Sequence, residues 1–79
     1  MTDIRLSEDL WRNGMLPEGI LERWHVANGA DVVSGAKVAE VRIESALHEI
    51  VAPAAGKLTI LTEANAVVEP GTVLGRLGG

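Results

Sequence analysis

The side chains in this sequence that could do chemistry are few and scattered. Ser45 stands at a predicted tight turn, and its hydroxyl is a nucleophile only where a base activates it. His25 and His48 are the residue type that supplies such a base or ligates a metal. Lys37 and Lys57 are interpreted as solvated surface residues, because lysine is seldom buried. The chain has no cysteine, so disulfides, thiolate metal sites and cysteine nucleophiles are excluded.

These residues do not combine into a catalytic site. Catalysis by a nucleophile needs an adjacent base and a group that holds the base in place. His25 and His48 fall on separate predicted strands with no clear carboxylate partner, and we interpret both as surface residues. Ser45 is interpreted as a polar turn residue. We therefore expect no hydrolase, no metal enzyme and no catalytic activity of any other kind.

The composition narrows the possible partners. The 79 residues make one small domain, with a net charge of −4 and seven basic residues that form no basic stripe, so nucleic-acid binding is not expected. No apolar run approaches the ~20 residues that cross a bilayer, and no signal peptide is visible. We expect a cytoplasmic protein with no membrane association.

The elements that position these residues are predicted to be short strands. A hairpin over Glu40–Pro53, with its turn near Glu44 and Ser45, is the stretch around which the chain is organised. No long amphipathic helix appears, and Gly, Pro and Asn interrupt every apolar run, which favours an all-β barrel or sandwich. Ser7 could cap a short helical turn through Trp11, or that stretch could be a loop that pins Trp11 to the core. The other expected elements are a first strand around Ile4 and Leu6, a surface loop Asn13–Gly19, and a strand Ile20–Ala27 with Ile20, Glu22, Trp24 and Val26 on one face. They continue with a brief extended piece at Val32 and Val33, a strand Lys57–Thr62, a turn, short extended piece and second turn over Asn65–Gly71, and a strand Val73–Leu77.

An internal repeat sharpens the fold prediction. Gly29-x-x-Val32-x-x-Gly35-x-x-Val38 superposes on Asn65-x-x-Val68-x-x-Gly71-x-x-Leu74 with a constant offset of 36 residues. Gly19 and Gly56 each open the strand before its unit. Asn65 replaces Gly29 because Asn is the next best residue at a left-handed turn position. One unit could not bury its apolar face alone, so two units should pack as a pseudo-two-fold pair of sheets.

The same spacings carry a resemblance to a known family, over residues 19–77 of a single domain 1–79. The residues that carry it are Trp24, Gly29-x-x-Val32-x-x-Gly35, Ala39-Glu40-Val41, Glu49-Ile50-x-Ala52-Pro53-Ala54-Ala55-Gly56 and Val68-x-x-Gly71-x-x-Leu74. The chain resembles the biotinyl/lipoyl attachment domains, the swinging-arm carriers of 2-oxo acid dehydrogenase complexes and biotin-dependent carboxylases. The resemblance implies a flattened β-barrel, or barrel-sandwich hybrid, of two short antiparallel sheets.

The family attaches lipoate or biotin to a lysine at the hairpin tip, in Asp-Lys-Ala or Met-Lys-Met. Counted back from Pro53 and Glu49, those three places hold Glu44, Ser45 and Ala46. The acidic residue and the alanine of the lipoyl version are present, but the lysine is replaced by serine. Attachment joins the cofactor's carboxyl group to a lysine amine as a stable amide, whereas a serine hydroxyl could give only a labile ester. No covalent cofactor is therefore expected on the chain as sequenced.

Two functional hypotheses follow from the resemblance. The first is an interaction or docking module without a covalent arm, related to the acyltransferase components of 2-oxo acid dehydrogenases, with a multienzyme complex or a cofactor ligase as its partner. The second is a genuine carrier domain, modified at Lys37 or Lys57 or altered at position 45. Glu40, Glu44 and Glu49 are interpreted as a solvated face, with docking of a partner enzyme as the alternative. Trp11 and Trp24 are predicted to be core residues.

Overall fold

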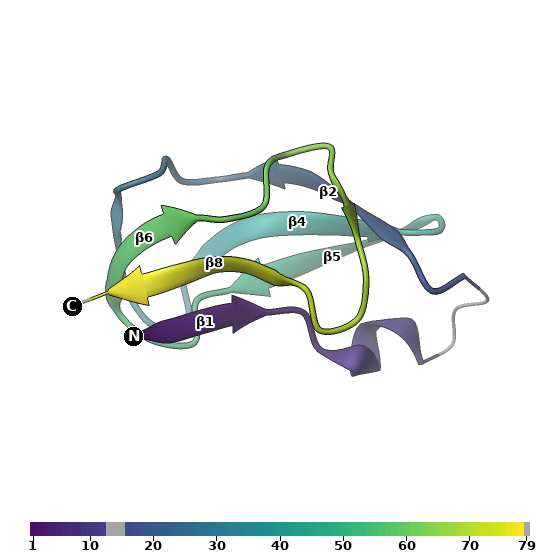
Figure 1. Cartoon of the computed structure of the whole chain (residues 1–79), viewed down its shortest axis with the longest axis horizontal. Coiled ribbons are helices and arrows are strands. Elements are labelled where there is room, and N and C mark those ends of the chain that lie inside the picture. The colour runs from purple at the N-terminus through teal and green to yellow at the C-terminus, as the bar shows by residue number, and fades with distance from the viewer. Residues whose placement is uncertain (13–15, 79) are drawn as a thin grey trace.

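The computed structural model describes residues 1–12 and 16–78. These residues form two four-stranded antiparallel sheets and one short 3-10 helix, η1 (Glu8–Trp11) (Figure 1). The strand orders are β1-β8-β6-β3 and β5-β4-β2-β7. The prediction of an all-β flattened barrel of two short sheets is confirmed. The strands are β1 (Thr2–Arg5), β2 (Gly19–Trp24), β3 (Asp31–Val32), β4 (Lys37–Ile43), β5 (Ala46–Val51), β6 (Gly56–Ile60), β7 (Val67–Val68) and β8 (Val73–Gly78).

The predicted duplication is visible in the topology. Strands β2, β3 and β4 correspond to β6, β7 and β8, and each short strand pairs with the other unit: β3 with β6, and β7 with β2. The matching turns have matching backbone angles, with φ of 87° at both Gly35 and Gly71, 89° at Gly29 and 74° at Asn65. Because the short strands are exchanged between units, neither unit completes its sheet alone.

The core between the sheets is almost entirely aliphatic. Leu21 and Val41 from one sheet and Leu58 and Leu74 from the other are at most 1% exposed. Their burial follows from the inward-facing positions of paired strands, which alternate with polar residues on the outer faces. No polar or charged residue is buried within the described part of the chain.

Strand β2 differs from the prediction in its length and in which side chains face inward. It ends at Trp24, and a β-bulge lies between Leu21 and Arg23 in its pairing with β4. A bulge adds one residue and so reverses the alternation of side chains. Leu21 therefore faces the core before the bulge and Trp24 faces it afterwards, whereas Ile20 pairs with Arg42 on the outer face. The predicted single face containing Ile20, Glu22, Trp24 and Val26 is wrong.

The two tryptophans cover opposite parts of the core. Ser7 caps η1 by accepting a hydrogen bond from the Asp9 backbone N–H at 3.1 Å. Of the two alternatives for this stretch, the helical turn is the one observed, and Trp11 lies in the core as both predicted. Trp24 is half-buried, and its Nε1 donates to the Thr62 carbonyl oxygen at 2.9 Å. The predicted loop Asn13–Gly19 lies partly outside the described residues. Strand β6 ends at Ile60, two residues before the predicted Thr62.

The molecule is elongated, with extents of 37 × 20 × 16 Å. The β4–β5 hairpin lies at one end, and the ends of β1 and β8 lie at the other (Figure 1), where Thr2 pairs with Leu77. The hairpin tip is therefore remote from both termini. No helix in the described part of the chain has the length and apolar character needed to cross a membrane.

Candidate functional site

The tip of the β4–β5 hairpin lies where the sequence predicts it. Ile43 pairs with Ala46, so the connecting turn consists of Glu44 and Ser45 alone. Glu44 has a φ of 56°, and such left-handed angles are what short hairpin turns require. Ser45 and Ala46 are exposed. The three predicted site residues thus form one projecting, solvent-accessible tip.

Two shallow depressions flank this tip. The larger, about 360 Å³, lies between η1 and the hairpin, and the smaller, about 230 Å³, lies on the side of β2 and β7. Glu44 lines both. The other residues of the larger depression are Asp9, Leu10, Ile43, Ser45, Ala46 and His48. The Ser7 cap indicates a helical turn at η1, but nothing in the sequence indicates that η1 packs beside the hairpin.

The residues around the tip do not form a catalytic pair. His48 and Ser45 line the same depression, yet no hydrogen bond joins the Ser45 hydroxyl to His48 or to any other described residue. A nucleophilic serine needs a base within hydrogen-bonding distance. Within residues 1–12 and 16–78, no group of three or more His, Asp or Glu side chains is arranged to hold a metal.

His25 has a carboxylate partner that the sequence did not reveal. Its Nε2 lies 3.3 Å from Glu40 Oε1, and Arg23 Nε lies 3.3 Å from the same oxygen. The bulge in β2 places Arg23 and His25 on the outer face, with Arg23 directly opposite Glu40 in β4. The prediction that His25 lacks a carboxylate partner is wrong, because the phase of β2 changes at the bulge.

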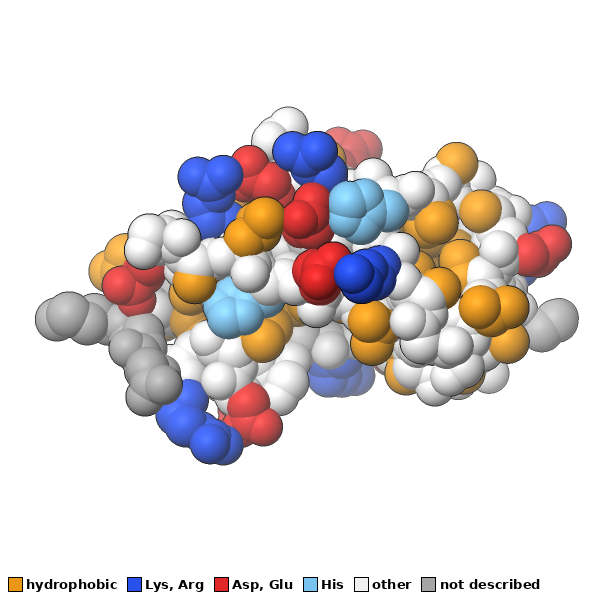
Figure 2. Space-filling model, turned by 180° about the vertical axis from the view of Figure 1, so that it is seen from behind, with side chains coloured by type: hydrophobic (Ala, Val, Ile, Leu, Met, Phe, Trp, Pro, Cys, Tyr) orange, Lys and Arg blue, Asp and Glu red, His pale blue; other side chains and the backbone are white. Residues whose placement is uncertain are grey.

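Ion pairs extend along this outer face of the hairpin-bearing sheet. Arg42 contacts Glu22 at 2.9 Å and Lys37 contacts Glu49 at 3.1 Å, and acidic and basic side chains intermingle across the face (Figure 2). The side chain of Glu40 is only 15% exposed. The interpretation of Glu40 as part of a solvated face is therefore wrong, because its side chain is largely buried beside Arg23 and His25. Glu49 is exposed, as that interpretation predicted.

The two lysines lie far from the tip. Lys37 begins β4, whose other end is at the hairpin turn, so about 20 Å separates them, since a strand rises roughly 3.3 Å per residue. Lys57 pairs with Asp31 and Gly78, at the end of the molecule that holds the termini. Both lysines are exposed. Neither is part of a projecting turn like the one that holds Ser45.

Comparison with known proteins agrees with this architecture. The lipoyl domain of the 2-oxoglutarate dehydrogenase complex from Azotobacter vinelandii has a similar solution structure, with a TM-score of 0.75, 21% sequence identity and coverage of 96% of each chain. At that identity the likeness concerns the fold. No curated protein sequence matches the chain. The family model Biotin_lipoyl, described as biotin-requiring enzyme, matches residues 14–77. The chain therefore belongs to the Biotin_lipoyl family.

Proposed function

We propose that this chain is a Biotin_lipoyl domain without a covalent arm, which acts as a non-catalytic interaction module. The observation that carries the proposal is Ser45, which occupies the exposed two-residue turn where the resemblance places the modified lysine. A cofactor carboxyl group condenses with an amine to give a stable amide. The Ser45 hydroxyl lacks an activating base among the described residues, so the corresponding ester is not expected to form.

The preserved scaffold supports an interaction role. The duplicated turns, the two sheets with their exchanged short strands and the projecting hairpin are all present, although the tip has no attachment amine. A hairpin that projects between two depressions remains a shaped surface that another protein can bind. By analogy with the solved lipoyl domain, we infer that the partner is a component of a multienzyme complex or the ligase that would modify a carrier.

The alternative is a carrier that is modified at Lys37 or Lys57, and the geometry weighs against it. Lys37 is engaged by Glu49 at 3.1 Å and lies on the side of a strand. Lys57 lies within β6, next to the β8 strand. A cofactor on either lysine would project from the end of the molecule opposite the hairpin.

The decisive test is in vitro labelling with a lipoate ligase, lipoate and ATP. We expect no label on the wild-type chain and lipoylation of the Ser45→Lys variant at position 45. The matched control is Ser34→Lys, because Ser34 is also an exposed serine in a turn but lies at the opposite end of β4. That variant should not be labelled.

Two results would contradict the proposal. Labelling of the wild-type chain at Lys37 or Lys57 would show a carrier with a displaced arm. A Ser45→Lys variant that folds but takes no label would contradict the assignment of position 45 as the equivalent of the attachment lysine.

A further inference from the structure

Strand β5 is an open edge of the hairpin-bearing sheet. It pairs only with β4, and it is the outermost strand in the order β5-β4-β2-β7. No backbone hydrogen bond from the described residues reaches its outer side. Proteins usually protect such an edge with a proline, a bulge or a covering segment. Ala46–Val51 contains no proline, and its pairing with β4 runs without irregularity from Ala46 to Ile50.

The pairing shows which backbone groups the open edge presents. In an antiparallel pair, alternate residues direct their N–H and C=O groups toward the neighbouring strand. Ile43 and Ala46 flank the two-residue turn, and their N–H and C=O groups point toward each other. The N–H and C=O groups of His48 and Ile50, at every second position from Ala46, therefore also point toward β4. Leu47 and Glu49 therefore present their N–H and C=O groups to the free side, where an extended peptide could bind them.

The side chains of β5 define what such a peptide must carry. Leu47 and Val51 lie on the outer face and are 51% and 49% exposed. Glu49 lies between them, and its side chain is half-exposed although Lys37 Nζ lies 3.1 Å from its Oε2. On the inner face, Ala46 and His48 line the depression of about 360 Å³, so a side chain opposite His48 would enter that depression.

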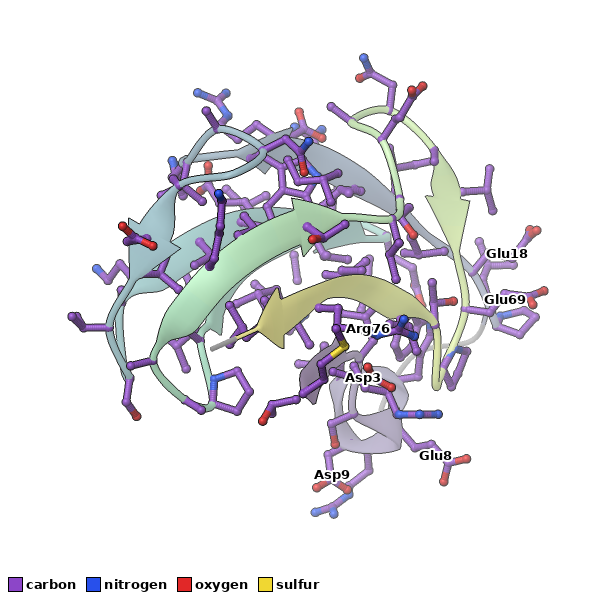
Figure 3. All side chains as sticks on the ribbon, turned by 60° about the vertical axis from the view of Figure 1, so that its left-hand side comes forward. Asp3, Glu8, Asp9, Glu18, Glu69 and Arg76 are labelled. Carbon is purple, nitrogen blue, oxygen red and sulfur yellow. The ribbon has the colours of Figure 1, made fainter. Side chains whose placement is uncertain are left out.

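A second copy of this chain is a poor occupant of the edge. Pairing of Leu47–Val51 with itself about a two-fold axis places Glu49 opposite its equivalent, and like charges directly opposite are destabilising. Pairing of Ala46–Ile50 places Leu47 opposite Glu49. The net charge of −4 adds repulsion between copies. Glu8, Glu18 and Glu69 point away from the body of the molecule (Figure 3), and the net negative charge of the whole chain favours a basic partner.

We propose that β5 binds an extended segment of a partner protein as an added antiparallel strand. The segment has Lys or Arg opposite Glu49 and apolar side chains opposite Leu47 and Val51. This inference rests on the proposed role as an interaction module and names the surface and the chemistry of its partner. Peptide binding tests the added-strand proposal, whereas cofactor labelling tests the absence of a covalent arm. Either proposal can therefore fail without the other.

The test uses a cyclic β-hairpin peptide with the outer strand Val-Thr-Arg-Leu-Val, which is pre-formed so that ordering costs do not mask binding. Amide hydrogen exchange is measured residue by residue on the intact chain. At a peptide concentration ten times the Kd, exchange at Leu47 and Glu49 should slow about tenfold. Strand β1, an edge strand of the other sheet, is the internal control, and its amides should be unchanged.

Two variants and a second peptide keep the test specific. Leu47→Pro removes an outward N–H without removing a bond to β4, so it should abolish binding while the thermal melt shows a folded chain. Glu49→Gln should weaken binding up to about fivefold, and so should replacing the peptide's Arg with Glu.

The proposal is overturned by either of two results. One is an unchanged exchange rate at Leu47 and Glu49 in the presence of millimolar peptide. The other is a chain that dimerises by itself with Leu47 and Glu49 already protected, which would make a second copy the occupant.

Discussion

At the scale of single residues, the left-handed turns test the duplication most directly. Gly35 has a φ of 87°, and an added Cβ there would meet no atom within 4 Å. Any cost of substitution therefore comes from the backbone angle alone. Gly35→Val should lower the free energy of unfolding by about 1–2 kcal/mol, and Gly35→Asn by clearly less, because Asn tolerates left-handed angles.

Urea unfolding of the three proteins measures this difference. Gly78→Ala is the matched control, because Gly78 also has open space around it but lacks a positive φ. Equal stability of the Val and Asn variants would show that the turn does not depend on the left-handed angle.

Single residues also show where sequence reasoning succeeds and fails. The turn positions Gly35, Gly71 and Asn65 were predictable, because only a few residue types tolerate a positive φ. The contact of His25 with Glu40 was not predictable, because it depends on the bulge at Glu22, and no residue type in β2 marks that bulge.

At the scale of elements, the two tryptophans differ in how they join parts of the fold. Trp24 in β2 donates from Nε1 to the Thr62 carbonyl after β6, and so links the two sheets. Trp11 in η1 is buried, but its Nε1 has no hydrogen-bond partner among the described residues. A buried donor without a partner carries a desolvation cost that phenylalanine would remove.

Trp24→Phe should therefore lower the free energy of unfolding by about 1–3 kcal/mol more than Trp11→Phe does. Only the Trp24 substitution leaves a carbonyl oxygen without its hydrogen-bond donor. Thermal melts followed by far-UV circular dichroism compare the two, since tryptophan fluorescence is altered in both. A larger loss for Trp11→Phe would mean that the inter-sheet hydrogen bond contributes little.

The type of each secondary-structure element was predictable from the sequence, but the pairing of the strands was less so. The strands, the hairpin turn and the helical turn after Ser7 follow from local patterns of apolar and turn residues. The exchange of β3 and β7 between units was not predictable, because two-residue strands carry no signal for their partner. The packing of η1 beside the hairpin is likewise a long-range contact that periodicity does not encode.

At the scale of the whole molecule, the pseudo-two-fold symmetry makes a quantitative prediction. Val32 and Val68 are equivalent positions in β3 and β7, with exposures of 6% and 1%. Val32→Ala and Val68→Ala should each lower the free energy of unfolding by about 2 kcal/mol, because each removes two buried carbons. Chemical denaturation measures both values.

The neighbouring valines provide the control. Val33 and Val67 are 67% and 59% exposed, so Val33→Ala and Val67→Ala should change stability by less than about 0.5 kcal/mol. If the losses of unfolding free energy in Val32→Ala and Val68→Ala differ by several-fold, the two units do not contribute equally to the stability of the core. The repeat would then be a similarity of topology alone.

The hairpin tip and the chain termini lie at opposite ends of the molecule. The termini leave from one end and the hairpin projects from the other, so a module tethered by its termini would present Ser45 outward. The fold was accessible from the sequence because the repeat and the turn residues constrain it. What binds the tip was not accessible, because recognition depends on surface shape that several separate elements build together.

The measurement that most directly tests the armless role is the intact mass of the protein purified from its own host, followed by a peptide map. The predicted mass is that of the unmodified sequence, with Ser45, Lys37 and Lys57 all recovered in unmodified peptides. A mass raised by one lipoyl or biotinyl group, mapped to any of these three residues, would contradict the proposal and restore a carrier function.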